Sequence, residues 1–396
     1  MQSDISPYRK TMSERKSLLI PGDFPPVVSG IATYFVEIWK HFPPEKCYIL
    51  APKDEGWQSF DAASPLNIIR RCIPTGNTTK AKILKSLLHT FWTIILHLRY
   101  KFDILHCGQV LSSGITGWTL KKLFGVPYVI YVYGSETYRF GDKPLLMNSI
   151  RSFLENADKI IPNSRFTMQE FLNIGIPAEK FDVITPGVDT TRFTPMPKDP
   201  ALIEKYNLSG KFVLLTVARL DERKGHDFVI RTIARLRNKF RNISYLIVGK
   251  GREEEALRKL VNELGVSDKV IFAGFVADED LPKYYNLSDL FILLNRQSSA
   301  NERLKGDYEG FGIVFLEASA CAKPVIAGNF GGIHDAVEDD KSGYIIDGTD
   351  LNAIVATVER LITDESQRLE IGRHGLQRAQ RYFDWKTISK KVQPYL

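Results

Sequence analysis

The sequence predicts an α/β protein in which two doubly wound domains face each other across a cleft. Three observations lead to this fold class. Short apolar runs of four to six residues alternate with longer stretches of helical period. This alternation forms two successive blocks, and prolines interrupt the chain between them. The length of 396 residues is sufficient for two domains, since a domain usually takes about 100–200 residues.

The strands of both blocks are continuous apolar runs, which are typical of parallel strands buried on both faces. In the first block we expect strands at 17–21, 48–51, 104–106, 128–133, 159–162 and 183–185. In the second block we expect them at 212–217, 245–248, 270–272, 290–294, 324–327 and 344–346. Helical patterns lie between them, for example at 227–240, 253–264 and 351–363. Strand–helix–strand alternation of this kind predicts doubly wound sheets.

The boundary between the domains is expected in the segment 186–200, where Pro195, Pro197 and Pro200 disfavour regular structure. We therefore end the first domain at residue 189 and begin the second at residue 190. In open α/β sheets ligands bind beyond the carboxyl ends of the strands. The cleft between two such domains is the expected binding site.

The composition excludes several classes of protein. Hydrophobic residues make up 44% and charged residues 25% of the chain, which is typical of globular domains and not of disordered or disulfide-stapled chains. The four cysteines show no Cys-x-x-Cys spacing, so we expect no structural zinc and a reducing compartment. Residues 1–15 lack the apolar core of a signal peptide. We expect a cytoplasmic protein.

The net charge is +7, and basic residues gather in 62–102, a stretch without any acidic residue. They are Arg70, Arg71, Lys80, Lys82, Lys85, Arg99 and Lys101. Such a stretch favours an anionic partner. Within it, 87–98 is the most apolar window of the chain, too short to span a bilayer, which needs about 20 residues. It is interpreted either as a core helix with solvated basic ends or as a helix lying on an anionic membrane.

The segment 309–324 carries the most informative motif. Gly310 and Gly312 permit a tight turn, and the apolar residues that follow suit a helix entering the core. The free amides of Gly312 and Ile313 at the start of such a helix are an anion site. Glu309 precedes the turn, and Glu317 lies two turns into the helix, where a carboxylate needs a partner. The motif indicates a nearby phosphate or sugar hydroxyl; an ordinary capped helix is the alternative.

Two cations follow the strand expected at 212–217. Arg219 and Lys224 lie at its carboxyl end, beside the start of a helix, which matches a diphosphate better than a neutral ligand. A solvated basic loop is the alternative. A second turn, Val248-Gly-Lys-Gly251, follows the next strand. Because Glu254 occupies the position of the third glycine, the turn is a weak signature for a dinucleotide.

Taken together, these pieces resemble the retaining glycosyltransferases of family 4, which have the GT-B fold. The resemblance covers about 17–385 in the family's order and rests on 24–30, Asn163-Ser164, 186–189, Phe193, Arg219 with Lys224-Gly225, 248–251, Glu309 to Glu317, and Gly331-Gly332. It implies two Rossmann-like domains, with 1–189 binding the acceptor and 190–376 binding the nucleotide-sugar donor. The last helix, in 377–396, is implied to cross back onto the first domain.

The resemblance assigns roles to matching residues. It implies that Glu317 binds the ribose hydroxyls of the nucleotide and that Glu309 binds hydroxyls of the donor sugar. Arg219 and Lys224 are implied to neutralise the diphosphate leaving group, as a metal does in other transferases. Such enzymes use no metal and no cofactor. Attack on the same face as the leaving group, with a donor phosphate oxygen taking the acceptor's proton, requires no general base from the protein.

Further positions follow from the same resemblance. The amides of Gly312 and Ile313 are implied to hold the phosphates, Gly30 to let the first loop approach them, and backbone near Phe275 to contact the base. At the end of one strand, Tyr133 stands where the family usually has a histidine that contacts the donor sugar; a tyrosine still donates a hydrogen bond but carries no positive charge. An insertion at 296–308 is interpreted either as a mobile lip over the donor or as surface decoration.

The expected function is transfer of a hexose, such as glucose or mannose, from a UDP- or GDP-sugar to an acceptor hydroxyl. Polysaccharide, lipopolysaccharide or glycolipid assembly is the expected context, with a lipid-linked acceptor reached from the inner face of the membrane. Two alternatives are a non-catalytic nucleotide-sugar-binding protein and an NAD-dependent oxidoreductase. No nucleic acid is expected as a partner, because the basic residues surround an apolar helix without stacking aromatics.

Overall fold

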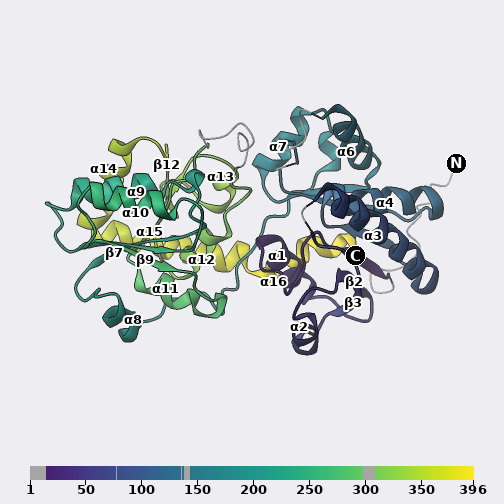
Figure 1. Ribbon diagram of the computed structural model, residues 1–396, viewed down its shortest axis with the longest axis horizontal. Helices are drawn as coiled ribbons and strands as arrows, with labels where there is room; N and C mark the ends of the chain where they lie inside the picture. The colour runs from purple at the N-terminus through teal and green to yellow at the C-terminus, as the bar shows by residue number, and fades with distance from the viewer. Residues whose placement is uncertain (1–14, 77, 135, 138–142, 298–307) are drawn as a thin grey trace. The chain divides into compact units, whose positions relative to one another are not determined.

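The computed structural model describes residues 15–76, 78–134, 136–137, 143–297 and 308–396 (Figure 1). The chain forms two compact units. The N-terminal unit comprises Met1–Ile184 together with Trp385–Leu396, and the C-terminal unit comprises Thr185–Asp384.

The N-terminal unit contains a six-stranded parallel sheet in the order β3-β2-β1-β4-β5-β6. Its strands are β1 (Ser17–Ile20), β2 (Cys47–Pro52), β3 (Asn67–Arg71), β4 (Ile104–Cys107), β5 (Tyr128–Val132) and β6 (Lys159–Pro162). The prediction of a strand at 183–185 is wrong. The chain there makes only two hydrogen bonds to β6, from the amides of Asp182 and Ile184, before it reaches Pro186. The edge strand β3 was not expected, because its apolar residues are followed directly by Arg70 and Arg71.

Helices cover both faces of this sheet. They are α1 (Gly30–Trp39), α2 (Trp57–Ala63), α3 (Thr79–Tyr100), α4 (Val110–Phe124), α6 (Pro144–Asn156), α7 (Arg165–Asn173) and α16 (Trp385–Val392). One core lies between the sheet and α3, α4 and α6, and the other lies between the sheet and α1 and α16. Trp385 of α16 makes an edge-on contact with Tyr34 of α1, with ring centroids 6.0 Å apart. The last helix is therefore part of the N-terminal core.

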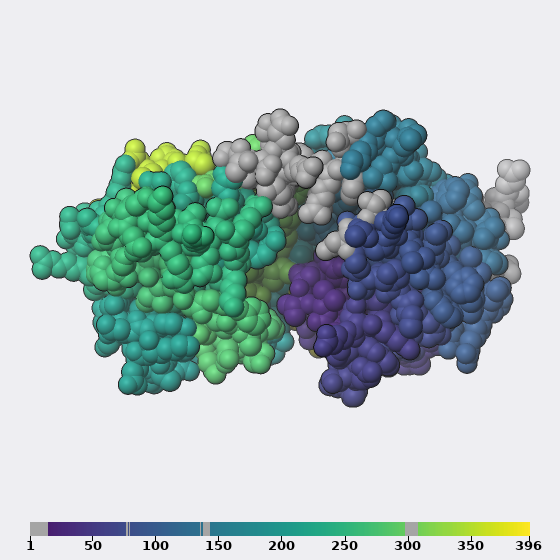
Figure 2. Space-filling view, viewed as in Figure 1, coloured from purple at the N-terminus to yellow at the C-terminus, as the bar shows by residue number. Residues whose placement is uncertain are grey.

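Helix α3 contains the apolar window 87–98 and extends it to 22 residues. One face, with Thr93 and Leu96, is buried in the core. The other face exposes large apolar side chains, namely Ile83, Leu84, Leu87, Phe91, Ile95 and Leu98. In the space-filling view the helix, in dark blue, forms part of the visible surface of its unit (Figure 2). Within the described residues no helix is both long and apolar enough to cross a bilayer.

The C-terminal unit repeats the architecture, with a parallel sheet in the order β12-β11-β10-β7-β8-β9. Its strands are β7 (Phe212–Val217), β8 (Ile243–Val248), β9 (Val270–Gly274), β10 (Leu290–Leu293), β11 (Val325–Gly328) and β12 (Gly343–Ile346). All six lie at the expected places. The prediction of an α/β fold with two doubly wound sheets is confirmed.

The helices of the C-terminal unit are α8 (Pro200–Lys205), α9 (His226–Leu236), α10 (Glu254–Glu263), α11 (Leu281–Leu287), α12 (Ile313–Ala320), α13 (Ile333–Ala336), α14 (Leu351–Thr363) and α15 (Glu365–Arg378). Helices α9, α10 and α14 pack on one face of the sheet, and α11 and α12 pack on the other. Because all strands are parallel, the loops after β7, β9, β10 and β11 meet at one edge of the sheet. Those loops carry the residues singled out by the sequence.

Candidate active site

The loop after β7 lies directly against the end of β10. It contains a short 3-10 turn, Glu222–Lys224, and then Gly225 in the left-handed conformation (φ +69°). A Cβ at position 225 would stand 2.4 Å from the Leu294 carbonyl oxygen, which no side chain tolerates. The amide of Arg296 also donates to the Arg223 carbonyl oxygen (2.9 Å). Close backbone packing of the two loops therefore fixes where Lys224 lies.

Lys224 forms an ion pair with Glu309, and Arg223 Nη1 lies 3.6 Å from the same carboxylate oxygen, Oε2. All three side chains are largely buried; that of Lys224 is only 10% exposed. Burial by itself would raise the pKa of Glu309, but Lys224 and Arg223 hold that pKa below its usual value. Burial lowers the pKa of Lys224, and Glu309 partly offsets this effect. The cluster brings together two cations and one anion in a poorly solvated place.

The backbone of Glu309 is held by the loop after β11. Gly331 adopts φ +103°, and a Cβ there would stand 2.2 Å from the Glu309 carbonyl oxygen. The amide of Gly332 donates to that same oxygen (2.8 Å). The glycine pair therefore allows close backbone contact, and this contact fixes the start of the turn that leads into α12.

Helix α12 begins immediately after Gly312, with Ile313 as its first residue. The amides of the first turn of a helix have no partner within the helix and carry the positive end of its dipole. Glu317 lies in the second turn and is half-buried. Its Oε2 accepts a hydrogen bond from Tyr285 Oη (2.6 Å). Burial raises the pKa of Glu317 to about 7.

Arg219 and Phe275 lie at the rim of the same edge. The Arg219 side chain is 68% exposed, and its Nη2 lies 3.4 Å from Asp221 Oδ2. His226, at the start of α9, is buried and fixes the loop from below, because its Nε2 donates to the Arg219 carbonyl oxygen (3.2 Å). Phe275 follows β9, and its ring is exposed.

The structure therefore brings Arg219, Lys224, Glu309, Gly312, Ile313, Glu317 and Phe275 to the loop edge of one sheet. Arg223 was missed by the sequence analysis, although it is more deeply buried and closer to Glu309 than Arg219 is. Its position next to Lys224 was the available signal. Tyr285 was also missed, because nothing in the sequence places it beside Glu317.

Gly30 and Tyr133 belong to the N-terminal unit. Gly30 is the first residue of α1, whose amide at Ala32 donates to the Ser29 hydroxyl (3.1 Å). Tyr133 follows β5, and its hydroxyl is buried without a hydrogen-bond partner among the described residues. Burial raises the pKa of Tyr133 well above its usual value, so the phenol stays protonated and able to donate.

The loop between β1 and α1 is fastened by two basic residues of the stretch 62–102. Lys85 Nζ donates to the Gly22 carbonyl oxygen (2.7 Å), and Arg70 Nη2 donates to the Pro25 carbonyl oxygen (2.8 Å). These side chains thus face the interior of the unit. Part of the basic stretch supports this loop, while Lys80, Lys82, Arg99 and Lys101 are exposed.

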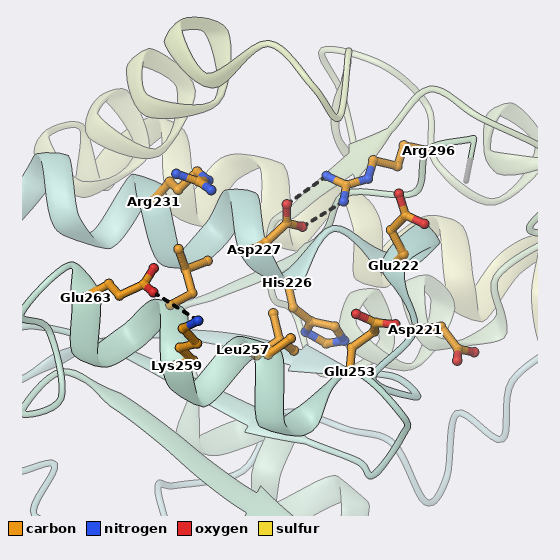
Figure 3. A pocket seen from close by; sticks show the side chains of 12 residues that line it. Asp221, Glu222, His226, Asp227, Arg231, Glu253, Leu257, Lys259, Glu263 and Arg296 are labelled. Atoms are coloured by element: carbon orange, nitrogen blue, oxygen red, sulfur yellow. Dashed lines mark hydrogen bonds and ion pairs between the residues drawn. The ribbon is translucent and has the colours of Figure 1, made fainter. Parts of the chain in front are cut away.

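A separate pocket of about 440 Å³ lies between α9 and α10 (Figure 3). Its lining combines Asp221 and Glu253 with the ion pair between Asp227 and Arg296, whose Oδ1 and Nη2 are 3.0 Å apart. Neither Lys224, Glu309 nor Glu317 lines it. The candidate site is therefore the charged cluster and not this pocket. Most of the expected lip, 298–307, lies outside the described residues, which contain no group of three or more potential metal ligands.

Comparison with known proteins gives consistent matches over nearly the whole chain. Residues 199–378 match the family described as Glycosyl transferases group 1, and residues 28–192 match Glycosyltransferase Family 4. A GDP-mannose-dependent alpha-(1-6)-phosphatidylinositol monomannoside mannosyltransferase of Mycolicibacterium smegmatis is 30% identical over 382 residues, covering 95% of this chain and 96% of the relative. The protein of the same name from Mycobacterium tuberculosis (strain H37Rv) is 28% identical and covers 96% and 97%.

Solved structures show the same fold. The structure of Anabaena HepE in complex with UDP and glucose is similar with a TM-score of 0.76 at 19% identity, covering 96% of this chain and 98% of that one. Sucrose-phosphate synthase from Thermosynechococcus elongatus gives a TM-score of 0.77 at 21% identity, with the same coverage.

Proposed function

The chain belongs to glycosyltransferase family 4 and is a hexosyltransferase, and from this premise we propose that it transfers mannose from GDP-mannose to a lipid-linked acceptor. The observation that carries the proposal is the buried cluster of Lys224, Arg223 and Glu309 beside the first turn of α12. Relatives matched over almost their full length are named for GDP-mannose and for phosphatidylinositol mannoside acceptors. These names support the donor and the acceptor class. The matching families and these relatives are glycosyltransferases, which argues against the oxidoreductase alternative.

The cluster has the charge needed for a diphosphate leaving group. A diphosphate develops negative charge as the bond to the sugar breaks, and buried cations stabilise that charge more strongly than cations in water do. An ammonium group has three N–H donors, so Lys224 can contact Glu309 and a phosphate oxygen at once. We assign leaving-group stabilisation to Lys224 and Arg219, with Arg223 as a third cation.

The remaining residues are assigned to the sugar, the ribose, the phosphates and the base of the donor. Glu309 would accept hydrogen bonds from hydroxyls of the sugar, and Glu317 from hydroxyls of the ribose. The amides of Gly312 and Ile313 would bind phosphate oxygens. We further assign Gly30 to the phosphates, Tyr133 to the sugar and backbone near Phe275 to the base. Transfer would retain the configuration of the sugar, with no catalytic base from the protein.

The surface of α3 supports an acceptor held in a membrane. Its exposed apolar residues lie between Lys80 and Lys82 at one end and Arg99 and Lys101 at the other. Leu123 and Phe124, at the end of α4, add exposed apolar area. An apolar strip between basic residues fits the boundary between acyl chains and anionic headgroups. We call this face the α3 strip; it consists of the exposed residues Ile83, Leu84, Leu87, Phe91, Ile95 and Leu98 with the flanking Lys80, Lys82, Arg99 and Lys101. We propose that the α3 strip rests on the inner face of the membrane.

The deciding experiment is a transfer assay with the purified protein. GDP-mannose and UDP-glucose, each labelled in the sugar, are incubated with vesicles containing phosphatidylinositol monomannoside, and lipid-bound label is counted. Label from GDP-mannose alone would support the proposal. Label from UDP-glucose alone would overturn the donor, and donor hydrolysis without lipid-bound label would overturn the acceptor. Binding of both nucleotides without turnover would favour the non-catalytic alternative.

A further inference from the structure

Three segments converge on Glu317 in the C-terminal unit. Tyr285 comes from α11, and its hydroxyl donates to Glu317 Oε2 (2.6 Å). Arg192 comes from the stretch that follows Pro186-Gly-Val-Asp189, and Asp278 comes from the short 3-10 turn after β9. Arg192 Nη1 lies 2.7 Å from Asp278 Oδ2. The charges of Arg192 and Asp278 both act on the Glu317 carboxyl.

The surroundings of Tyr285 make its hydroxyl a hydrogen-bond donor to Glu317 and keep it protonated. Its side chain is fully buried, and its ring packs edge-on against Phe193 and at a tilt against Phe291, with both pairs of centroids 5.7 Å apart. Burial and the neighbouring Glu317 raise the pKa of the phenol well above its usual value, so it keeps its proton. Among the described residues it is the one hydrogen-bond donor to the Glu317 side chain. Oε1 therefore stays available.

Arg192 is held over the ring of Phe193, with its guanidinium carbon 4.6 Å from the ring centroid. Asp189 supports this arrangement, because its Oδ1 accepts from the amides of Thr191 and Arg192 (3.0 and 3.1 Å). The motif 186–193 carried part of the family resemblance without any role of its own. In the structure the motif holds the Arg192 side chain in place, and the positive charge of Arg192 acts on Glu317.

We propose that Tyr285 is a positioning residue for Glu317: its hydrogen bond fixes one carboxylate oxygen and leaves the other free for the ribose diol. Arg192 does not contact Glu317 and acts on it only through its charge. The proposal rests on the assignment of Glu317 to the ribose. Two neighbouring hydroxyls are best bound by a group that only accepts hydrogen bonds, which is the ionised carboxyl. A protonated Glu317 carries a donor in place of one acceptor. Nucleotide affinity should therefore rise as Glu317 loses its proton.

The neighbours of Glu317 set the pH at which this happens. Burial is the largest effect and raises the pKa of Glu317; the hydrogen bond from Tyr285 lowers it, Asp278 raises it and Arg192 lowers it, with a result of about 7. Cys321, which directly follows the last residue of α12, is buried and its pKa is raised, so it stays neutral in this range. The affinity for nucleotide should thus increase between pH 6 and pH 8.

The test is calorimetric titration of the full chain with GDP, and in parallel with UDP, from pH 5.5 to 9. Wild-type affinity should rise with pH, whereas Glu317→Gln should show only the titration of the diphosphate itself, which all variants share. Tyr285→Phe should bind about 10-fold more weakly at pH 7, the loss expected for one hydrogen bond to a charged group. Its midpoint should move to higher pH, and the affinity should recover above it.

Two further variants distinguish an effect of charge on the Glu317 carboxyl from an effect of damage to the structure. Asp278→Asn removes the negative neighbour, so the midpoint should move to lower pH and the affinity at pH 7 should rise. Arg192→Met should move the midpoint in the same direction as Tyr285→Phe, and it replaces Tyr285→Phe should that variant not fold. Tyr284→Phe is the matched control, because its hydroxyl pairs with Tyr206 (3.0 Å) and not with Glu317.

Kinetics provide an independent readout. Contacts to the ribose are the same before and during the reaction, so Tyr285→Phe should raise the KM for the donor and leave kcat nearly unchanged. A Tyr285→Phe variant with the affinity and pH profile of the wild type would overturn the inference while Glu317→Gln still lost affinity. Failure of the wild type to bind either nucleotide would instead overturn the proposed function. A loss of kcat at constant KM would also contradict a positioning role.

Discussion

Lys224 and Glu309 form a buried ion pair although 85 positions separate them in the chain. Two glycines make this pairing possible. Gly225 lets the loop after β7 lie against the end of β10, and Gly331 lets the loop after β11 lie against the backbone of Glu309. The pair thus joins three neighbouring loops at the edge where parallel α/β sheets bind their ligands.

Lys224→Met should lower both activity and stability. We expect kcat to fall by about 10²–10³-fold, as for the loss of one electrostatic contact to a developing charge. The free energy of unfolding should fall by about 3–5 kcal/mol, since Glu309 would keep only the more distant Arg223. Steady-state kinetics and urea unfolding measure the two effects. The double variant Lys224→Met/Glu309→Gln should regain most of the stability and none of the activity; near-wild-type turnover would remove the assignment.

Arg219 and Arg223 should separate function from stability. Arg219→Ala should reduce kcat/KM about 100-fold and change the free energy of unfolding by less than about 0.5 kcal/mol, because the side chain is exposed. Arg223→Ala should reduce both quantities. Arg252→Ala is the matched control, since Arg252 is also exposed and lies 3.5 Å from Asp221, the partner of Arg219. An equal kinetic loss in Arg252→Ala would argue for a general charge effect.

Glu317 should make the protein less stable as pH rises. The pKa of its carboxyl is raised to about 7 in the folded chain, against about 4.3 in an unfolded one. The folded state therefore holds the proton more tightly, and stability is lost as pH rises from about 4.3 through 7. Without nucleotide, Glu317→Gln should have a higher Tm than the wild type at pH 8 and a similar Tm at pH 5, measured by calorimetry.

Glu309→Gln should change the pH dependence of stability in the opposite way to Glu317→Gln, because the pKa of Glu309 is lowered and that of Glu317 is raised. Lys224 and Arg223 hold the pKa of Glu309 below its usual value, so its contribution to stability is present above about pH 4.3 and is lost only as pH falls further. Glu309→Gln should thus be less stable than the wild type at both pH 5 and pH 8. The same sign of change in Glu317→Gln and Glu309→Gln at pH 8 would contradict this account.

The α3 strip should bind anionic vesicles. Leu87→Glu/Phe91→Glu should abolish cosedimentation with vesicles that contain phosphatidylinositol, because two charges would have to enter the headgroup boundary. Lys80→Glu/Lys82→Glu should weaken binding and reduce its salt dependence. Leu145→Glu, on α6 of the same unit, is the control, since Leu145 is exposed but lies outside the strip. Unchanged cosedimentation of the first two variants would remove the membrane proposal.

Lys85 does not belong in that experiment, although it is a basic residue of the same helix. Its Nζ bonds to the Gly22 carbonyl oxygen, and burial lowers its pKa. From the sequence alone Lys80, Lys82 and Lys85 are equivalent, because helical spacing does not tell which side chain meets a loop 63 residues earlier. The same limit hid Tyr285, whose role depends on a contact with Glu317, 32 positions away in the chain.

Local patterns were sufficient for most of the fold. Eleven of the strands in the described residues are short apolar runs, and the sequence places all of them. The edge strand β3 was missed because only one short apolar run, Ile68 and Ile69, precedes its arginines. The run at 183–185 was misread because its hydrogen bonds reach β6 only at two amides before Pro186. In both cases, whether the segment forms a strand depends on its position at the edge of the sheet. A single sequence does not reveal that position.

Helix α16 belongs to the N-terminal unit, yet the whole of Thr185–Asp384 precedes it in the chain. During translation the N-terminal unit lacks the core contacts of Trp385, Ile388 and Val392 until the ribosome has synthesised the other unit. The C-terminal unit is made from one uninterrupted segment and can close its core first. The N-terminal unit can therefore complete its core only after Thr185–Asp384 has been made, and truncation within α16 would remove core residues of the N-terminal unit.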